Sequence, residues 1–401
     1  MFDVETERRL LAALRSKRWS VSWDGEGGKS LERRFAEAFA AYNGTGYCVS
    51  VDHGSSALLI ALESLGIGPG DEVIVPVLTW VAPATAVLRV GAVPVLADVD
   101  PKTGCLTADT IVDAISSQTK AVVVVHLGCT VADLDSIRRV ALDVGIFVIE
   151  DCSQAHGAVW NGKRVGTLGD LGVYSLGAAK TLAGGEGGAV ITNDPDRFRH
   201  LQMLRADSRR YPETARLTGC PELVEDGEIM GANYCMSELT ASVLLDQLQR
   251  LDDHNAVRQQ RASELELRLA ELGMFDTIPV PPQVTTRGIY EYGVQVKPGV
   301  LGALSIDVFA DAVSAELNAR VYPPRAPLYR SVLLRPQTKR RYAELWEKAL
   351  ARGSLREEYS GADAYRERTL LFHHSMLLGT SEDVRDIAAA FEKIALSFRA
   401  V

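Results

Sequence analysis

The run Ala121-Val122-Val123-Val124-Val125 is the feature that most constrains the fold of this chain. A strand that is apolar at every position has to be buried on both faces, which is typical of a parallel sheet with helices packed on each side. From Tyr47 to about Asp194, further short runs rich in β-branched residues alternate with longer segments of helical periodicity. This alternation predicts an α/β fold.

Seven strands and the helices around them can be assigned from this alternation. The expected strands are Tyr47–Val51, Val73–Val77, Val93–Val99, Ala121–His126, Phe147–Ile149, Gly172–Leu176 and Ala189–Thr192. The expected helices are Arg8–Leu14, Leu31–Ala41, Gly54–Leu65, Ala82–Val90, Ala108–Ser116, Leu134–Val144 and about Asp196–Arg205. Because most of the strands are joined through helices, we expect the sheet to be mostly parallel.

The second part of the chain has a different pattern. A long amphipathic helix is expected from about Ser237 to Leu269, because its leucines recur at helical spacing between charged residues. A strand at Tyr290–Val296, a proline cluster after Tyr322 and a closing helix at Glu382–Phe398 follow. We therefore predict a large domain over residues 1–250, with an N-terminal helical segment, and a smaller α+β domain over residues 251–401.

Composition narrows the class of function. The 401 residues include 43 Lys and Arg against 52 Asp and Glu, a formal charge of −9. Binding to nucleic acid depends on basic side chains that neutralise phosphates, so we expect no nucleic-acid partner. The chain has no basic-then-apolar leader and no run of about 20 apolar residues, so we expect a cytoplasmic protein without a membrane partner. Its six cysteines form no C-x-x-C pair, and neither a metal site nor a disulfide framework is expected.

Two residues near the ends of expected strands can carry chemistry. Asp151 follows the strand that begins at Phe147, at the edge where open α/β sheets bind ligands. Lys180 lies between an apolar strand and the glycine-rich turn Gly184–Gly188, where its amine need not face water. A desolvated lysine has a lowered pKa and becomes a nucleophile toward aldehydes. Taken alone, each residue has a commoner explanation, as a helix cap for Asp151 and as a surface lysine for Lys180.

A phosphate site and an aromatic plate are suggested by two neighbouring segments. Ser55 and Ser56 follow Gly54 at a strand-to-helix junction, where free backbone N–H groups and the helix dipole favour an anion. Simple N-capping is the alternative for these serines. Trp80 follows another strand, so its ring is either a stacking surface for a planar ligand or a core aromatic. A lysine, a carboxylate, a phosphate cradle and a stacking ring are together what pyridoxal phosphate requires of a protein.

Three longer motifs add a family resemblance. They are Glu150-Asp151-Cys152-Ser153-Gln154-Ala155-His156-Gly157-Ala158, Tyr174-Ser175 followed by Lys180 and Gly185-Glu186-Gly187-Gly188-Ala189, and Gly231-Ala232-Asn233-Tyr234-Cys235-Met236-Ser237-Glu238. In order and spacing the chain resembles the DegT/DnrJ/StrS family of sugar aminotransferases. The resemblance implies the aspartate-aminotransferase fold, known as fold type I of the pyridoxal-phosphate-dependent transferases, with a mostly parallel seven-stranded sheet.

The resemblance also implies roles for individual residues. Lys180 is the lysine that bonds the cofactor covalently and moves the proton during transfer, and Asp151 pairs with the ring nitrogen of pyridoxal phosphate. Gln154 lies near the ring hydroxyl, and Trp80 stacks on the ring. Ser55, Ser56 and Ser175 contact the phosphate. Asn233 reaches the phosphate of the partner subunit, which implies a homodimer with shared sites.

The resemblance is greatest to the scyllo-inosose and 2-deoxy-scyllo-inosose aminotransferases and to aminohydroxybenzoate synthases, through Leu328-Tyr329-Arg330 and the basic segment Arg335–Tyr342. It implies transfer of an amino group from L-glutamine or L-glutamate to a keto-cyclitol or keto-sugar in antibiotic biosynthesis. Tyr322, His373 and His374 are candidate substrate contacts, because they are polar or aromatic groups in a domain that should close over the site, although lone residues of this kind are more often structural. The alternatives are a nucleotide-linked keto-sugar aminotransferase and a dehydrating or aromatising synthase of the same fold. A regulator that binds the cofactor without turnover is disfavoured, because no DNA-binding segment is visible.

Overall fold

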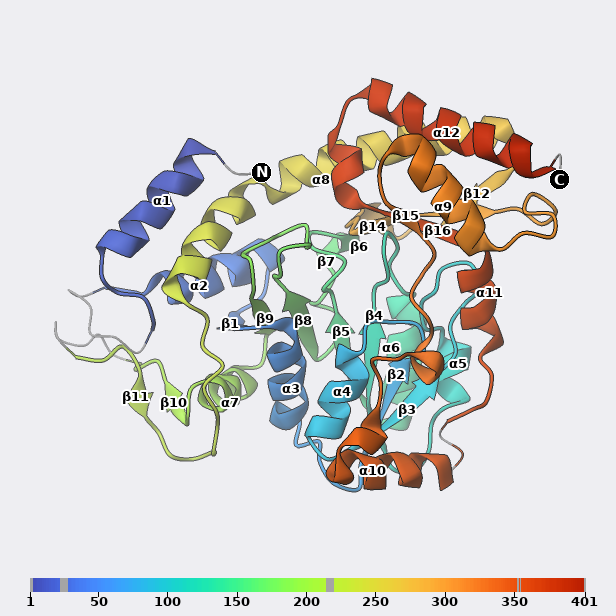
Figure 1. Ribbon diagram of the computed structural model, residues 1–401. Coiled ribbons are helices and arrows are strands. Elements are labelled where there is room, and N and C mark those ends of the chain that lie inside the picture. Colours follow the sequence, from blue (N-terminus) through green and yellow to red (C-terminus); the bar gives the residue numbers. More distant parts are fainter. Residues whose placement is uncertain (1–2, 22–27, 214–219, 352, 354, 400–401) are drawn as a thin grey trace.

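A seven-stranded sheet forms the centre of the molecule (Figure 1). The computed structural model describes residues 3–21, 28–213, 220–351, 353 and 355–399. The strand order is β1-β9-β8-β5-β4-β2-β3, in which β9 is antiparallel to both neighbours and the other pairs are parallel. The mostly parallel α/β sheet expected from the sequence is therefore confirmed. The strands are β1 (Tyr47–Val51), β2 (Glu72–Pro76), β3 (Val93–Ala97), β4 (Thr119–Val125), β5 (Phe147–Asp151), β8 (Leu171–Ser175) and β9 (Gly188–Thr192).

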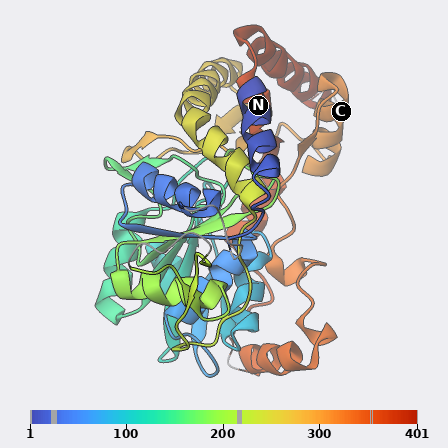
Figure 2. The same ribbon diagram turned by 90° about the vertical axis from the view of Figure 1, so that its left-hand side faces the viewer.

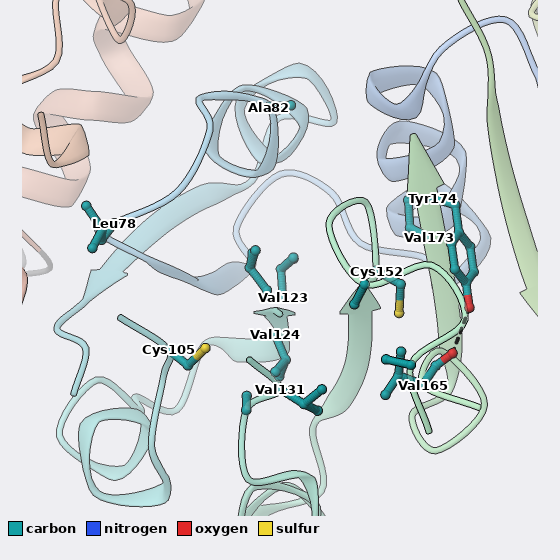
Figure 3. Packing of buried hydrophobic residues seen from close by; sticks show 14 of the residues in the cluster. Leu78, Ala82, Cys105, Val123, Val124, Val131, Cys152, Val165, Val173 and Tyr174 are labelled. Carbon is teal, nitrogen blue, oxygen red and sulfur yellow. Dashed lines mark hydrogen bonds between the residues drawn. The ribbon is translucent and has the colours of Figure 1, made fainter. Parts of the chain in front are cut away.

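The apolar run of β4 lies in the middle of the hydrophobic core. Val123 and Val124 are both fully buried, and Figure 3 shows their side chains on opposite faces of the strand. Burial on both faces is possible because helices cover the two sides of the sheet. These helices are α3 (Gly54–Ser64), α4 (Ala82–Arg89), α5 (Ala108–Val112), α6 (Leu134–Val144) and α7 (Pro195–Arg205).

One long helix, α8 (Glu238–Leu272), runs from the N-terminal helices to the C-terminal helix. It begins after the N-cap Ser237 and ends at Gly273, whose positive φ of 66° closes the helix in the left-handed conformation. The helices α1 (Val4–Arg15) and α2 (Leu31–Asn43) pack against α8, and α12 (Ser381–Arg399) packs farther along it (Figure 2). None of the described helices is long and apolar enough to cross a membrane.

A smaller antiparallel sheet lies beside α8 and α12, with the order β12-β14-β16-β15. Helix α9 (Ile306–Leu317) packs between this sheet and α12. The strands are β12 (Phe275–Thr277), β14 (Glu291–Val296), β15 (Val321–Tyr322) and β16 (Thr369–His373). Two minor sheets are formed by β6 (Val159–Trp160), β7 (Lys163–Arg164) and β13 (Val284–Thr286), and by β10 (Arg209–Arg210) and β11 (Val224–Glu225).

After β15 the chain returns to the large sheet before it completes the small one. The backbone N–H of Leu328 donates to the carbonyl of Val77 at 2.7 Å. Helix α10 (Arg340–Ala351) lies against α4 and β3, far from α12 in both ribbon views (Figures 1 and 2). At the start of α11 (Ser360–Arg368), two backbone N–H groups donate to the carboxylate of Asp98. The predicted division of the chain at residue 250 stays a prediction.

A buried ion pair fastens the N-terminal part of the chain to the large domain. Arg205, at the end of α7, donates to the Glu32 carboxylate of α2 over 2.6 Å, and both side chains are almost completely buried. The hydroxyls of Ser50 and Tyr211 also donate to this carboxylate. Glu238, at the start of α8, accepts the backbone N–H groups of residues 31 and 32. The Glu32 carboxylate therefore joins α2 to α7, to β1 and to the segment after β10, and a second carboxylate, that of Glu238, joins α2 to α8.

Candidate functional site

Lys180 is partly buried at the carboxyl edge of the large sheet, in the turn that follows β8. Its amine lies 4.2 Å from the centre of the Tyr290 ring. Burial lowers the pKa of the Lys180 amine, and the positive charge of Arg325 lowers it further, whereas the carboxylates of Asp151 and Glu291 raise it. The net effect is a lowered pKa, which increases the fraction of neutral, nucleophilic amine at neutral pH.

Asp151 is the last residue of β5 and is 6% exposed. Its carboxylate accepts the backbone N–H of Ser153 at 3.0 Å, and its negative charge acts on the Lys180 amine. The hydroxyl of Ser153 in turn accepts the backbone N–H of Ser175 at 2.9 Å, which links the ends of β5 and β8. The structure therefore brings the predicted lysine and carboxylate together from separate strands.

The predicted phosphate-binding serines meet where α3 begins beside β8. A side chain at Gly54 would place its Cβ 2.7 Å from the Cβ of Ser175, and one at Gly188 would collide with the backbone of His53. These contacts require glycine and bring Ser55, Ser56 and Ser175 to one edge of the sheet. Helix α3 has no side-chain cap, because the N-cap residue His53 forms no such hydrogen bond. Among the described residues, the three serine hydroxyls have no hydrogen-bond partner.

Trp80 is 44% exposed, so it is not a core aromatic. It lies beyond the end of β2, and the guanidinium carbon of Arg325 lies 4.5 Å from the centre of its ring. Trp80 follows β2 and Lys180 follows β8, and these two strands run in the same direction in the sheet, so both residues lie at its carboxyl edge.

Gln154 is held by the turn after β4, since its side-chain oxygen accepts the backbone N–H of Gly128 at 2.7 Å. A separate, buried group consists of His126, Glu150 and Cys152, which offer metal-ligand atoms within 4.8 Å of one another. The Glu150 carboxylate accepts the N–H groups of Gly166, Leu168 and Gly169, and contacts His126 at 3.3 Å. The backbone N–H of Ala132 donates to His126. These hydrogen bonds give the group a structural role, in positioning the end of β5.

The histidines predicted as substrate contacts hold the peptide before Lys180. His374 accepts from Arg258 at 3.2 Å through Nδ1, so its Nε2–H donates to the carbonyl of Ala179 at 3.3 Å. His373 accepts the N–H of Ser375 through Nδ1 and donates to the same carbonyl at 3.1 Å. Burial and the charge of Arg258 lower the pKa of His374 to about 3, which keeps it neutral. The third candidate, Tyr322, donates to Glu291 at 2.7 Å.

Another neutral histidine supports the end of β8. His156 is 1% exposed, and burial together with the charge of Lys180 lowers its pKa to about 3. Its Nε2–H donates to the carbonyl of Ser175 at 2.9 Å. Its own carbonyl accepts from Asn255 of α8, which also binds Arg258. A buried hydrogen-bond network therefore joins α8 to both ends of the segment that carries Lys180.

Asn233 lies on the surface, and its side-chain oxygen accepts the N–H of Cys235 at 3.2 Å. Two large apolar side chains near this segment are exposed, Met230 at 95% and Trp19 at 56%. Met230 precedes Asn233 by three residues, and Trp19 lies beside the segment that follows Asn233, because its carbonyl accepts the N–H of Glu238.

Tyr290, Glu291 and Arg325 are site residues that the sequence did not reveal. The Tyr290 ring lies against the amine of Lys180, and the charges of Glu291 and Arg325 act on that amine. All three residues are more than 100 positions away in the sequence, just before and at the start of β14 and in the loop after β15. No spacing motif connects them to the lysine. The only signal was that Tyr290 begins an expected strand and that Arg325 follows the two prolines after Tyr322.

The sequence profile of the DegT/DnrJ/EryC1/StrS aminotransferase family matches residues 3–390. The chain belongs to this family. It is therefore an aminotransferase-family enzyme, as the motifs around Asp151 and Lys180 indicated.

Similar curated proteins cover almost the whole chain. The L-glutamine:2-deoxy-scyllo-inosose aminotransferase of Streptoalloteichus tenebrarius is 45% identical over 96% of this chain and 91% of its own. The L-glutamine:scyllo-inosose aminotransferase of Streptomyces griseus is 43% identical over 98% of this chain and 93% of its own. Among solved structures, 3-amino-5-hydroxybenzoic acid synthase superposes with a TM-score of 0.82 at 26% identity, covering 99% of this chain and 97% of that one. The predicted fold type is thereby confirmed.

Proposed function

We propose that this aminotransferase uses pyridoxal phosphate to transfer an amino group from L-glutamine or L-glutamate to a keto-cyclitol of the scyllo-inosose type. The observation that carries the proposal is the Lys180 amine, which is partly buried against Tyr290 beside the Asp151 carboxylate. The acceptor class is supported by relatives that are 42–45% identical and are named as aminotransferases of 2-deoxy-scyllo-inosose or scyllo-inosose.

The residues present fit the cofactor at three points. The hydroxyls of Ser55, Ser56 and Ser175 have no hydrogen-bond partner within the part of the chain that the structure describes, and they lie beside the start of α3, where no side chain caps the helix, which suits a phosphate dianion. Asp151 supplies the charge that would keep the ring nitrogen protonated, with Gln154 and Trp80 nearby for the hydroxyl and the ring face. When bound, pyridoxal phosphate supplies an aldehyde that takes up the amino group and a protonated ring that withdraws electrons.

The protein's own groups then perform the proton movements. The lowered pKa of Lys180 allows Nζ to accept a proton from the substrate carbon and return it to the adjacent position. Asp151 would hold the protonated ring nitrogen of the cofactor through its negative charge. Hydrogen bonds from His156, His373 and His374 orient the backbone around the lysine. The Tyr322 hydroxyl, which donates its proton to Glu291, and the Glu291 carboxylate both offer acceptor oxygens for the hydroxyls of a polyol.

The proposed reaction can be tested one half at a time. Purified protein loaded with pyridoxal phosphate is expected to absorb as a yellow species and to lose that band when L-glutamine or L-glutamate is added. The amine-loaded form should then recover the band with 2-deoxy-scyllo-inosose or scyllo-inosose. Recovery only with nucleotide-linked keto-sugars, or release of water with formation of an aromatic product, would identify one of the two alternative functions instead.

We further propose a cytoplasmic homodimer in which Asn233 completes the partner's site. The exposed apolar side chains of Trp19 and Met230 near Asn233 support a contact with a second copy there. Mixing inactive Lys180→Ala with inactive Asn233→Ala should restore about a quarter of the sites after random subunit exchange, because one site of each heterodimer is intact. If labelled subunits exchange and no activity returns, the shared site is refuted.

A further inference from the structure

One face of the small sheet lies against the segment that carries the reacting lysine. In an antiparallel sheet, the side chains of directly paired residues share a face, and so do those of every second residue along a strand. The register pairs Glu291 of β14 with His373 of β16, and Tyr322 of β15 with Leu371 of β16. Glu291, His373 and Tyr322 therefore share one face. His373 donates through Nε2 to the carbonyl of Ala179 at 3.1 Å, so this face meets the lysine segment.

The opposite face of the small sheet belongs to the hydrophobic core. Tyr292 of β14 and Phe372 of β16 are paired there, and both are completely buried. The Tyr292 hydroxyl donates to the carboxylate of Glu266 on α8 at 3.2 Å. Glu291 is only partly buried. The alternation along β14 therefore directs the Glu291 side chain toward the site and that of Tyr292 away from it.

The backbone at the start of β14 is fixed to the large domain beside the site. The N–H of Tyr290 donates to the carbonyl of Gly128 at 2.9 Å, and the N–H of Glu291 donates to the same carbonyl at 3.4 Å. The N–H of Gly128 in turn donates to the side chain of Gln154 at 2.7 Å. The Tyr290 ring lies 4.2 Å from the amine of Lys180. Glu291 is thus held at the turn that contacts Gln154, next to the residue whose ring lies against the lysine amine.

The Glu291 carboxylate has unused capacity to accept hydrogen bonds. Its Oε1 accepts the Tyr322 hydroxyl at 2.7 Å, which orients the carboxylate. Within the part of the chain that the structure describes, Oε2 has no hydrogen-bond partner and neither oxygen forms an ion pair. An ionised carboxylate has about four acceptor positions, so most of those on Glu291 are open to a ligand that brings donors. Hydroxyls on adjacent carbons of a polyol ring are such donors, and hydrogen bonds to a charged acceptor are stronger than neutral ones.

We propose that Glu291 binds two adjacent hydroxyls of the cyclitol and thereby recognises the acceptor of the amino group. This inference rests on the proposed function, in which the donor and the acceptor use the same site in turn. Both inososes carry hydroxyls on adjacent ring carbons, whereas L-glutamine and L-glutamate have no hydroxyl outside a carboxylate group. Glu291 therefore discriminates between the two half-reactions, because it strengthens binding of the cyclitol and not of the amino acid.

The test measures the two half-reactions separately. In Glu291→Gln, kcat/KM for recovery of the yellow band with scyllo-inosose or 2-deoxy-scyllo-inosose is expected to fall roughly 30-fold, because the charged acceptor is lost while the shape of the side chain is kept. Loss of the band with the amino acid that wild-type protein uses should change less than about threefold. Removal of the negative charge also lowers the pKa of Lys180, and this effect acts on both half-reactions, so the ratio of the two rates reports recognition of the acceptor.

Two further measurements separate recognition from a structural effect. scyllo-Inositol has the hydroxyls but no ketone, so calorimetry with the amine-loaded protein measures its binding without reaction; its Kd should rise about tenfold or more in Glu291→Gln. Tyr322→Phe removes the hydrogen bond that orients the carboxylate, and it should slow only the acceptor half-reaction, by about fivefold. Tyr292→Phe removes a tyrosine–glutamate hydrogen bond on the opposite face of the same sheet, and both rates and the Kd should keep their wild-type values.

The outcomes are distinguishable from failure of the proposed function. If amine-loaded wild-type protein recovers the yellow band with neither inosose, the proposed function is wrong, and the role of Glu291 falls with it. If wild-type protein accepts an inosose, but Glu291→Gln slows both half-reactions equally, slows neither, or binds scyllo-inositol as tightly as wild type, then Glu291 does not bind the acceptor.

Discussion

Replacing Lys180 by alanine is expected to lower the rate of amino-group transfer by ~10⁴-fold or more. The amine of this residue is the basic group that lies against Tyr290, and its lowered pKa prepares it to accept and return a proton at neutral pH. The Ala179 carbonyl receives hydrogen bonds from two histidines, so the backbone of the variant should keep its position. Single-turnover conversion of the cofactor by L-glutamine measures the effect.

Two comparisons show whether the amine acts through chemistry or only through charge. Lys180→Arg keeps the positive charge but has no amine that deprotonates near neutral pH, so it should be as inactive as Lys180→Ala. Added methylamine should restore part of the rate of Lys180→Ala, because a small free amine can perform the missing proton transfer. Retention of more than about one hundredth of the wild-type rate in Lys180→Ala would remove the lysine from the reaction.

Replacing Glu32 by glutamine is expected to destabilise the fold by about 3–5 kcal/mol. The substitution preserves the shape of the side chain but leaves the charge of Arg205 buried without compensation. The hydroxyls of Ser50 and Tyr211 lose a charged acceptor at the same time. Urea unfolding at a fixed, saturating cofactor concentration measures the shift in midpoint.

Glu37→Gln is the matched control, because Glu37 lies on the same helix and pairs with Lys29 and Arg33 while its side chain is 46% exposed. It should cost below about 1 kcal/mol. The double variant Glu32→Leu with Arg205→Leu should recover most of the stability, since no charge is left buried. An unchanged midpoint in Glu32→Gln, or an equal loss in the control, contradicts the assignment of a stabilising role to the buried pair.

The sheet was predictable because its signal is local. The run Ala121–Val125 is apolar at every position, which by itself predicts that both faces of this strand are buried. Strand β1 was likewise expected with the bounds that the structure has. The motifs that contain Asp151 and Lys180 were visible for the same reason, as each lies within a few residues of a strand end. The roles assigned to them stay predictions.

The remainder of the site depends on distant segments, which no local pattern describes. Tyr290 lies against Lys180, and Arg325 lies against Trp80, only because β14 and the loop after β15 fold back onto the large sheet. The histidine pair shows the same limit, because no local pattern indicated that the Nε2–H groups of His373 and His374 donate to the carbonyl of Ala179. Their role as substrate contacts stays a prediction.

The return of residues 323–365 to the large sheet has a consequence for protein engineering. Although these residues follow the small-sheet strand β15 in the sequence, they are bonded to Val77 and Asp98 of the large domain. The large structural unit is thus discontinuous in the chain. A chimaera that exchanges acceptor specificity between two relatives needs three junctions rather than one. A single crossover at residue 250 would take Trp80 from one relative and Arg325, whose guanidinium stacks on the Trp80 ring, from the other.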